Sequence, residues 1–421
     1  MKKPILGSQS FLSDNTKRVE SYEKYIKEVY DKPANEKPIY TGRYFMVLKE
    51  GQKSFAKTKK MLESKMGFSV ANSNDYVSES LNESNMEGAD VLIYEDLGVA
   101  LVGGEDEQIQ MLESADPNAD FILEPEKIVY IPDDSPGVLN IPSTWGIDIT
   151  QAINSQFTGQ EIKLAILDTG FDMEHPDYKG RIITTNSFVP DETIQDVHGH
   201  GTHCIGSACG NIDSNGQRYG VATNAWIYAG KVLSNQGSGA QSWILNGMMW
   251  AAKNGCKVIS MSLGSRVFPG QSYDMAYERA AQFAISKGAV VLAAAGNDSR
   301  RSWNQFNPVS SPADSPSILS VGALDSNLNI ADFSNRAINP TGKVDIAGPG
   351  VMIYSSWPMP IRYRTISGTS MATPHVAGIT ALLWEQNPNF KPDQIIEQLR
   401  NLTKKLSLPG IDIGAGLSIA P

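Results

Sequence analysis

Three side chains in distant parts of the sequence have the types that nucleophilic catalysis needs: Asp168, His200 and Ser370. A serine hydroxyl attacks a carbonyl carbon when an imidazole accepts its proton. A carboxylate then fixes the tautomer of that imidazole and stabilises its protonated form. Because long stretches of chain separate the three residues, only the fold can bring them together.

Each of these residues borders an apolar segment. Asp168 directly follows the run 164–167, which is typical of a buried strand. Ser370 starts an alanine-rich apolar pattern that predicts a buried helix. A serine at a helix start can cap the helix, or its hydroxyl can lie beside backbone N–H groups that stabilise an anion.

The segment after residue 145 alternates apolar strands with helical patterns, which predicts an α/β fold. We expect a doubly wound, mostly parallel sheet with helices on both faces, and functional groups beyond the carboxyl ends of the strands. The strands are expected at 164–167, 225–228, 257–261, 290–295 and 318–321, and the helices at 241–254, 274–287, 370–386 and 392–406.

Residues 43–131 show a different pattern, in the order β-α-β-β-α-β, which predicts a small α+β ferredoxin-like domain. Its elements are expected at 44–48, 55–66, 91–94, 97–102, 105–113 and 127–131. Nothing in this domain carries catalytic chemistry. Residues 1–42 are expected to form a helical N-terminal extension, and the turn-rich residues 132–144 a linker.

The composition excludes several classes of protein. A formal net charge of −10 over 421 residues argues against a nucleic-acid partner, and no apolar run has transmembrane length. Three cysteines do not make a disulfide framework. The first residues lack the apolar core of a signal peptide, so the chain as given is expected to be cytoplasmic, unless it leaves by another route or lacks a leader.

Three short segments carry a family resemblance: Asp168-Thr-Gly170, His200-Gly-Thr-His203 and Gly368-Thr-Ser-Met-Ala372. They resemble the signatures of the subtilisin-like serine proteases, or subtilases, in the family's order of Asp, His and Ser. The resemblance implies a subtilisin-like catalytic domain over 145–421. Residues 43–131 are similar to the family's inhibitory propeptide, which implies a processing site within 132–144.

The resemblance implies a role for each matching residue. Asp168 would orient the base, His200 would be the general base and Ser370 the nucleophile. The segment Ala294-Ala-Gly-Asn297 resembles the family's oxyanion segment, so Asn297 would donate to the oxyanion beside the Ser370 backbone N–H. The implied substrate-binding residues are Ser262, Leu263, Gly264, Gly237, Ser238, Gly239, Ala294, Ala295 and Gly296.

The implied function is that of a serine endopeptidase, made as a self-processing zymogen, which needs no cofactor for catalysis. Its partners would be polypeptide substrates and its own propeptide-like domain as an intramolecular inhibitor. The alternatives are a transpeptidase or macrocyclase, in which an amine replaces water, and a permanently inhibited binding protein. The pattern His198-x-His200-x-x-His203 also resembles zinc hydrolases, but His375 is the only later histidine that could complete such a site.

A structural calcium site is a further expectation. Asp177 matches a position where many subtilases supply a carboxylate, and Asp213 and Asn215 lie in a polar loop that offers oxygen ligands. The loop is about one residue longer than the usual calcium loop of the family, so a solvated polar loop is the alternative. Cys204 lies within the histidine motif, where it is either a small buried side chain or a mercurial-sensitive thiol.

Overall fold

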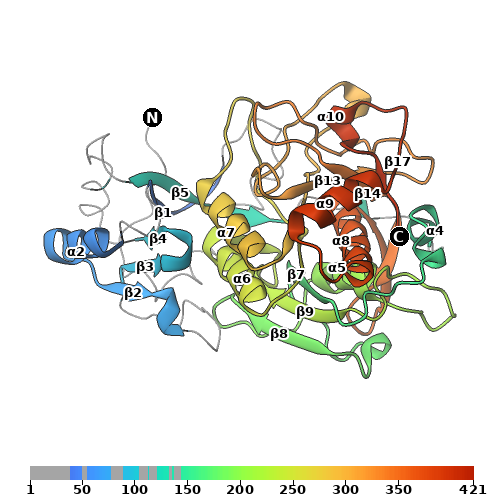
Figure 1. Cartoon of the computed structure of the whole chain (residues 1–421), viewed down its shortest axis with the longest axis horizontal. Coiled ribbons are helices and arrows are strands. Elements are labelled where there is room, and N and C mark those ends of the chain that lie inside the picture. The colour runs from blue at the N-terminus through green and yellow to red at the C-terminus, as the bar shows by residue number, and fades with distance from the viewer. Residues whose placement is uncertain are drawn as a thin grey trace.

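Figure 1 shows the chain in a computed structural model, with a small sheet on one side and a larger helix-covered body on the other. The structure describes residues 38–49, 55–76, 89–103, 112, 121–131, 135–136 and 144–421. The expected extension at 1–42 and the linker at 132–144 lie mostly outside these residues. Within them, no helix is long and apolar enough to cross a membrane.

The larger body is built on a nine-stranded sheet in the order β17-β18-β14-β13-β12-β11-β7-β9-β8. All neighbouring strands are parallel except β17 and β18. The strands are β7 (Lys163–Asp168), β8 (Ile183–Ser187), β9 (Trp226–Lys231), β11 (Val258–Met261), β12 (Val290–Ala294), β13 (Leu319–Leu324), β14 (Ile346–Pro349), β17 (Thr403–Lys404) and β18 (Leu417–Ser418).

Helices cover both faces of this sheet, so alternate residues of one strand enter two different cores. In β7, Leu164 and Ile166 pack with α5 and α8, whereas Ala165 and Leu167 pack with α6 and α7. The helices are α4 (Trp145–Ile149), α5 (His200–Cys209), α6 (Gln241–Lys253), α7 (Met275–Ser286), α8 (Thr369–Gln386), α9 (Pro392–Asn401) and α10 (Gly410–Ile413). The α/β class expected from the sequence is confirmed.

Two details differ from the sequence prediction. The helix expected at 392–406 ends at Asn401, because Thr403 and Lys404 pair with β18. The strands β8, β14, β17 and β18 of this sheet were not predicted. In β8 the sequence Ile-Thr-Thr-Asn-Ser is polar because the strand lies at the edge of the sheet and is half-buried.

The smaller sheet has the order β10-β5-β1-β4-β3-β2, in which β10 belongs to the larger body. Its elements are β1 (Tyr40–Leu48), α2 (Phe55–Met66), β2 (Val70–Asn72), β3 (Val91–Tyr94), β4 (Val99–Val102), β5 (Phe121–Tyr130) and β10 (Ser238–Ala240). The arrangement β5-β1-β4-β3 is that of a ferredoxin-like domain. Of the helix expected at 105–113, only Leu112 is among the described residues.

The two faces of the small sheet have different neighbours. Met46 and Leu48 of β1 pack with Leu62 of α2, whereas Phe45 and Val47 belong to the same core as α6 and α7. The small sheet therefore shares an apolar core with the larger body. Burying one such side chain contributes about 1.5–3 kcal/mol.

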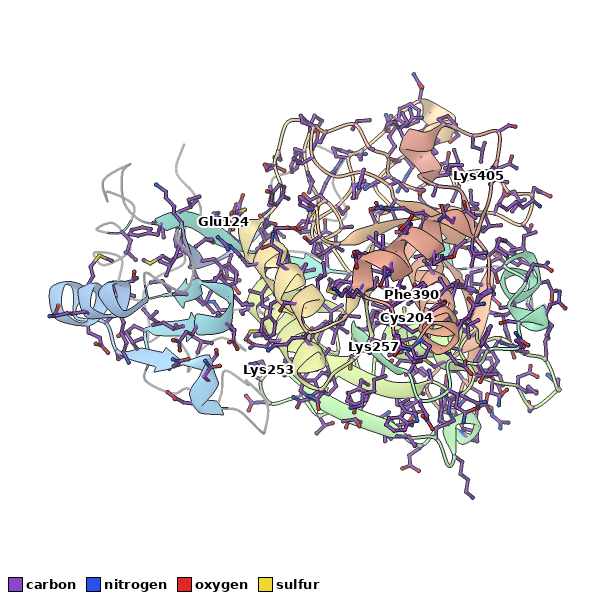
Figure 2. The ribbon with its side chains drawn as sticks, viewed as in Figure 1. Glu124, Cys204, Lys253, Lys257, Phe390 and Lys405 are labelled. Atoms are coloured by element: carbon purple, nitrogen blue, oxygen red, sulfur yellow. The ribbon has the colours of Figure 1, made fainter. Side chains whose placement is uncertain are left out.

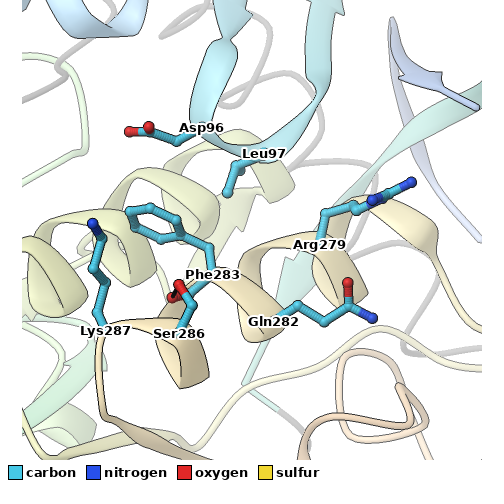
Figure 3. Close-up of a pocket in the computed structure, with 7 residues that line it drawn as sticks. All are labelled: Asp96, Leu97, Arg279, Gln282, Phe283, Ser286 and Lys287. Atoms are coloured by element: carbon cyan, nitrogen blue, oxygen red, sulfur yellow. Dashed lines mark hydrogen bonds between the residues drawn. The ribbon is translucent and has the colours of Figure 1, made fainter. Parts of the chain in front are cut away.

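Two smaller features complete the fold. A three-stranded sheet joins β15 (Ile353–Ser356), β16 (Tyr363–Ser367) and β6 (Ser135–Pro136), so the expected linker pairs with the strand that leads to Ser370. A cavity of about 320 Å³ lies between the turn Glu95–Leu97 and α7, lined by Asp96, Leu97, Arg279, Gln282, Phe283, Ser286 and Lys287 (Figure 3). None of the predicted catalytic residues lines it.

Candidate active site

The acid and the base come from two elements that meet at one edge of the large sheet. Asp168 is the last residue of β7 and His200 the first of α5. A Cβ on Gly201 would lie 2.3 Å from the Gly170 carbonyl oxygen, so only glycine lets α5 approach the turn after β7 this closely. This close packing brings Asp168 and His200 into contact.

The His200 Nδ1 atom lies 2.7 Å from Oδ1 of Asp168, and both residues are 1% exposed. The same carboxylate oxygen accepts the Thr169 N–H at 2.7 Å. An ionised Asp168 therefore holds the proton of His200 on Nδ1. In that tautomer Nε2 is the basic nitrogen, as a general base requires.

A second buried carboxylate, which the sequence reasoning missed, fixes the start of α5. Asp196 accepts hydrogen bonds from the Gly199 N–H at 2.7 Å and from the Thr202 N–H at 2.8 Å. It also accepts the hydroxyl protons of Thr169 and Thr202. The sequence signal was an acidic residue just before a glycine-rich helix start, which satisfies N–H groups there.

Ser370 lies in the first turn of α8, whose N-cap is Gly368 without a side-chain cap. The serine is thus not the helix cap. Its Oγ donates to the Ser262 carbonyl at a long 3.5 Å, and its own carbonyl accepts the Ser262 hydroxyl at 2.8 Å. Cys204 Sγ lies 3.8 Å from His200 Nδ1 and 3.6 Å from the Ser370 carbonyl, so α5 and α8 bring the base and the serine to the same place.

Asn297 presents an amide donor beside this serine. Its Oδ1 accepts the backbone N–H of Thr369 at 2.9 Å and the Thr369 hydroxyl at 2.7 Å. Its Nδ2 is buried and has no hydrogen-bond partner among the described residues. A buried amide donor costs free energy when it has no partner, so this group is suited to an oxygen that only a bound substrate supplies.

The predicted substrate-binding segments flank an extended strand of the chain itself. Tyr130, at the end of β5, exchanges two hydrogen bonds of 3.0 Å with Gly264, and the Ile131 N–H donates to the Gly237 carbonyl at 3.0 Å. On the β10 side, Ser238 and Gly239 are the register partners of Tyr130 and Val129. Residues 128–131 therefore lie between these two edges as a peptide strand would.

The remaining predicted substrate-binding residues line the same edge of the sheet. Leu263 is buried in the core that includes Val129. Ala294 ends β12, and Ala295 is fully buried after it. Gly296 has φ +104°, and its N–H donates to the Thr369 hydroxyl at 3.1 Å, which links the segment 294–297 to α8.

Acidic side chains of β5 contact the starts of two helices of the larger body. Glu124 accepts the N–H groups of Met275 at 3.0 Å and Ala276 at 3.2 Å, at the first turn of α7 (Figure 2). Glu126 accepts the Ser242 N–H at 2.9 Å in α6 and pairs with Arg43. Carboxylates at helix N-termini are stabilising, so β5 is held by more than its edge pairing.

The other histidines do not form a metal site with His200. Burial lowers the pKa of His203 to about 3 and that of His375 to about 4. Among the described residues, only Asp168, His200 and Cys204 form a group of three potential metal ligands. Because burial raises the pKa of the Cys204 thiol to about 12, it stays protonated near neutrality and is a poor zinc ligand. The zinc alternative gains no support.

The expected calcium ligands accept hydrogen bonds from tyrosines. Asp177 accepts the hydroxyls of Tyr219 at 2.8 Å and Tyr363 at 2.9 Å, and Asp213 accepts that of Tyr354 at 2.9 Å. Asp213 also accepts the backbone N–H of Asn215 at 2.8 Å. A cation here would face hydroxyl and amide hydrogens, so these residues fit calcium poorly, and the calcium site expected from the sequence is tested by chelation below.

We expect Tyr219→Phe, in a Ser370→Ala chain that cannot digest itself, to lower the free energy of unfolding by about 1.5–3 kcal/mol. That is the contribution of a hydrogen bond to a charged group. Denaturant titration measures it, with Tyr273→Phe as the matched control. A chelator should leave the stability unchanged, whereas a chelator-dependent loss would support calcium instead.

Comparison with known proteins gives consistent matches. The sequence profile described as "Subtilase family" matches residues 159–416. An alkaline protease of Alkalihalobacillus alcalophilus is 37% identical over 348 residues, which is 82% of this chain and 84% of that protein. M-protease of Shouchella clausii matches to the same extent. Subtilisin E of Bacillus subtilis is 41% identical over 253 residues, 59% of this chain and 62% of that protein.

Proposed function

The chain belongs to the subtilase family of serine endopeptidases, and we propose that Ser370, His200 and Asp168 are its catalytic residues. Ser370 Oγ forms a bond to the carbon of a peptide carbonyl while its proton passes to His200 Nε2. Asp168 holds the other ring nitrogen at 2.7 Å and stabilises the imidazolium. Catalysis in this family needs no cofactor.

The carbonyl oxygen becomes an anion in the tetrahedral intermediate. We assign its stabilisation to Asn297 Nδ2 and to the Ser370 backbone N–H at the start of α8. His200 then gives its proton to the departing amine, and the C–N bond breaks to leave an acyl-enzyme. Water attacks this ester while His200 Nε2 accepts its proton; that proton then passes to Ser370 Oγ as the ester C–O bond breaks, which releases the carboxylic acid and restores the serine and the neutral base.

We also propose that the chain is made as a zymogen, with residues 43–131 as an inhibitory domain and a processing site within 132–144. The support is the position of residues 128–131 between Gly264 and β10, where a substrate strand would pair. Substrate would enter the same groove once this strand leaves. The residues proposed to bind it are those of segments 237–239, 262–264 and 294–296.

The single observation that carries the catalytic proposal is the buried His200–Asp168 contact, which α5 places next to the start of α8 at Ser370. The test is to incubate the purified chain with a fluorophosphonate probe and to determine the N-terminus of the labelled species. We expect label on Ser370 and a new N-terminus within 132–144. A chain that stays full length and unlabelled would instead indicate a permanently inhibited binding protein.

A further inference from the structure

The contact between β5 and the larger body includes a buried ion pair. Lys127 Nζ lies 2.6 and 2.7 Å from the two carboxylate oxygens of Asp274, the residue before α7. Lys127 is 8% exposed and Asp274 9%. Burying a charge is costly unless its partner is close and well oriented, and here both oxygens of one carboxylate face the ammonium group.

A second buried carboxylate, that of Asp314, raises the pKa of the same ammonium group through its charge. Asp314 is 3% exposed, and neither of its carboxylate oxygens has a hydrogen bond from a described residue. The neighbouring Ser311 hydroxyl donates to Asp274 at 2.7 Å. Burial and then the charge of Asp274 raise the pKa of Asp314 to about 7, while Lys127 lowers it. Asp274 therefore pairs with Lys127 directly, while the charge of Asp314 also favours the charged form of this lysine, which comes from the small domain.

The backbone register fixes where this cation lies along the groove. Tyr130 pairs with Gly264 through both its N–H and its carbonyl, and Lys127 lies three residues earlier on the same strand. A strand rises about 3.3 Å per residue. Any peptide that pairs with Gly264 in this register would place its residue three positions earlier at Asp274 and Asp314.

We propose that Asp274 and Asp314 form a subsite for a basic side chain, lysine above all, three residues before the substrate residue that pairs with Gly264. This proposal rests on the proposed function, because Lys127 occupies the subsite until residues 128–131 leave the groove. Once Lys127 leaves, two buried carboxylates whose charges repel each other remain without a cation. An incoming lysine removes that repulsion, which gives the site its selectivity.

The test compares two acetylated peptides with the sequence of Glu124–Ile131, one with lysine and one with uncharged norleucine at position 127. Both are measured as inhibitors of the active enzyme, that is, the species that the fluorophosphonate probe labels in a separate sample. The assay follows the hydrolysis of a chromogenic peptide substrate. We expect the lysine peptide to bind about 10- to 100-fold more tightly, as a hydrogen bond to a charged group contributes. An arginine peptide shows whether the subsite takes either cation.

Enzyme variants separate this subsite from a general effect of charge. The ratio to compare is the affinity of the lysine peptide over that of the norleucine peptide. Asp274→Asn and Asp314→Asn should each bring this lysine-to-norleucine ratio toward one. The control Glu161→Gln removes an exposed carboxylate and should keep the ratio unchanged. Circular dichroism confirms that each variant is folded. A lysine-to-norleucine ratio within twofold of one in the unaltered enzyme would overturn the subsite. It would leave the proposed endopeptidase function intact. Absence of any labelled enzyme would overturn the proposed function, and the subsite with it.

The lysine preference should also depend on pH. The charged and titratable groups that act on Asp314 are Lys127 from β5 and Asp274 and Tyr277 at the start of α7. Burial and the charge of Asp274 raise the pKa of Asp314 to about 7 although Lys127 lowers it, so this pKa is higher still when the subsite lacks a cation. Lysine binding therefore releases a proton, and the ratio should rise from pH 6 to pH 9. Asp314→Asn should remove this rise, and a flat ratio in the unaltered enzyme would contradict the role of Asp314.

Discussion

Replacing Ser370 with alanine is expected to abolish endopeptidase activity and fluorophosphonate labelling. The substitution removes the only atom that can form the ester, while α8 and the His200–Asp168 contact stay in place. In subtilisin, loss of the nucleophile lowers turnover by about 10⁶-fold. The measurement is the hydrolysis of a fluorescence-quenched peptide substrate, together with fluorophosphonate labelling of the purified chain.

Two comparisons make this result specific. Ser302→Ala, at an exposed serine on the surface, should retain both activity and labelling. His200→Ala should lose nearly as much activity as Ser370→Ala, and the double variant little more, because the two residues act as a unit. If the double variant lost activity by the product of the two single-variant factors, His200 would not act through Ser370.

The same Ser370→Ala chain also tests how the precursor is processed. If the chain cuts its own linker, the variant should stay full length, because no acyl-enzyme can form. Mixing it with a small amount of active enzyme shows whether a second molecule can make the cut. A variant that is processed as fast as the unaltered chain would exclude self-processing, although it would leave the catalytic assignment intact.

Most of the candidate site could be predicted from sequence because its residues lie in short segments at strand ends and helix starts. Asp168 follows β7, and Ser370 lies in the first turn of α8. Local sequence determines both positions: an apolar run ends where a strand leaves the core, and small residues allow a close helix start. The α/β class followed from the same patterns.

The contacts that sequence did not reveal join residues from distant segments. Asp274 pairs with Lys127 only because β5 packs beside α7, and neither residue has a local pattern that marks the other. The tyrosines around Asp177 are of the same kind: Tyr219 and Tyr363 lie far apart in sequence but bond to one carboxylate. Polar side chains from separate loops leave no periodic signal, so their pairing depends on the tertiary structure.

The oxyanion donor gives the second large expected effect. Asn297→Ala should lower kcat by about 10²–10³-fold, as loss of the equivalent donor does in subtilisin. The reason lies in the two ends of its amide: Oδ1 accepts hydrogen bonds from Thr369, whereas Nδ2 is buried and finds no partner within the part of the chain that the structure describes. A donor that finds its acceptor mainly in the tetrahedral intermediate stabilises the transition state more than the bound substrate, so KM should change little.

Asn297→Asp distinguishes transition-state stabilisation from a structural role. Aspartate keeps the Oδ1 acceptor for the Thr369 N–H and hydroxyl, but it places an oxygen where the amide donor was. If Asn297 only holds the start of α8, this variant should be nearly as active as the unaltered enzyme. If its Nδ2 stabilises the oxyanion, kcat should fall at least as far as in Asn297→Ala, because a carboxylate repels the developing negative charge. Fluorophosphonate labelling should slow in parallel, since that reaction also places an oxygen anion beside Asn297.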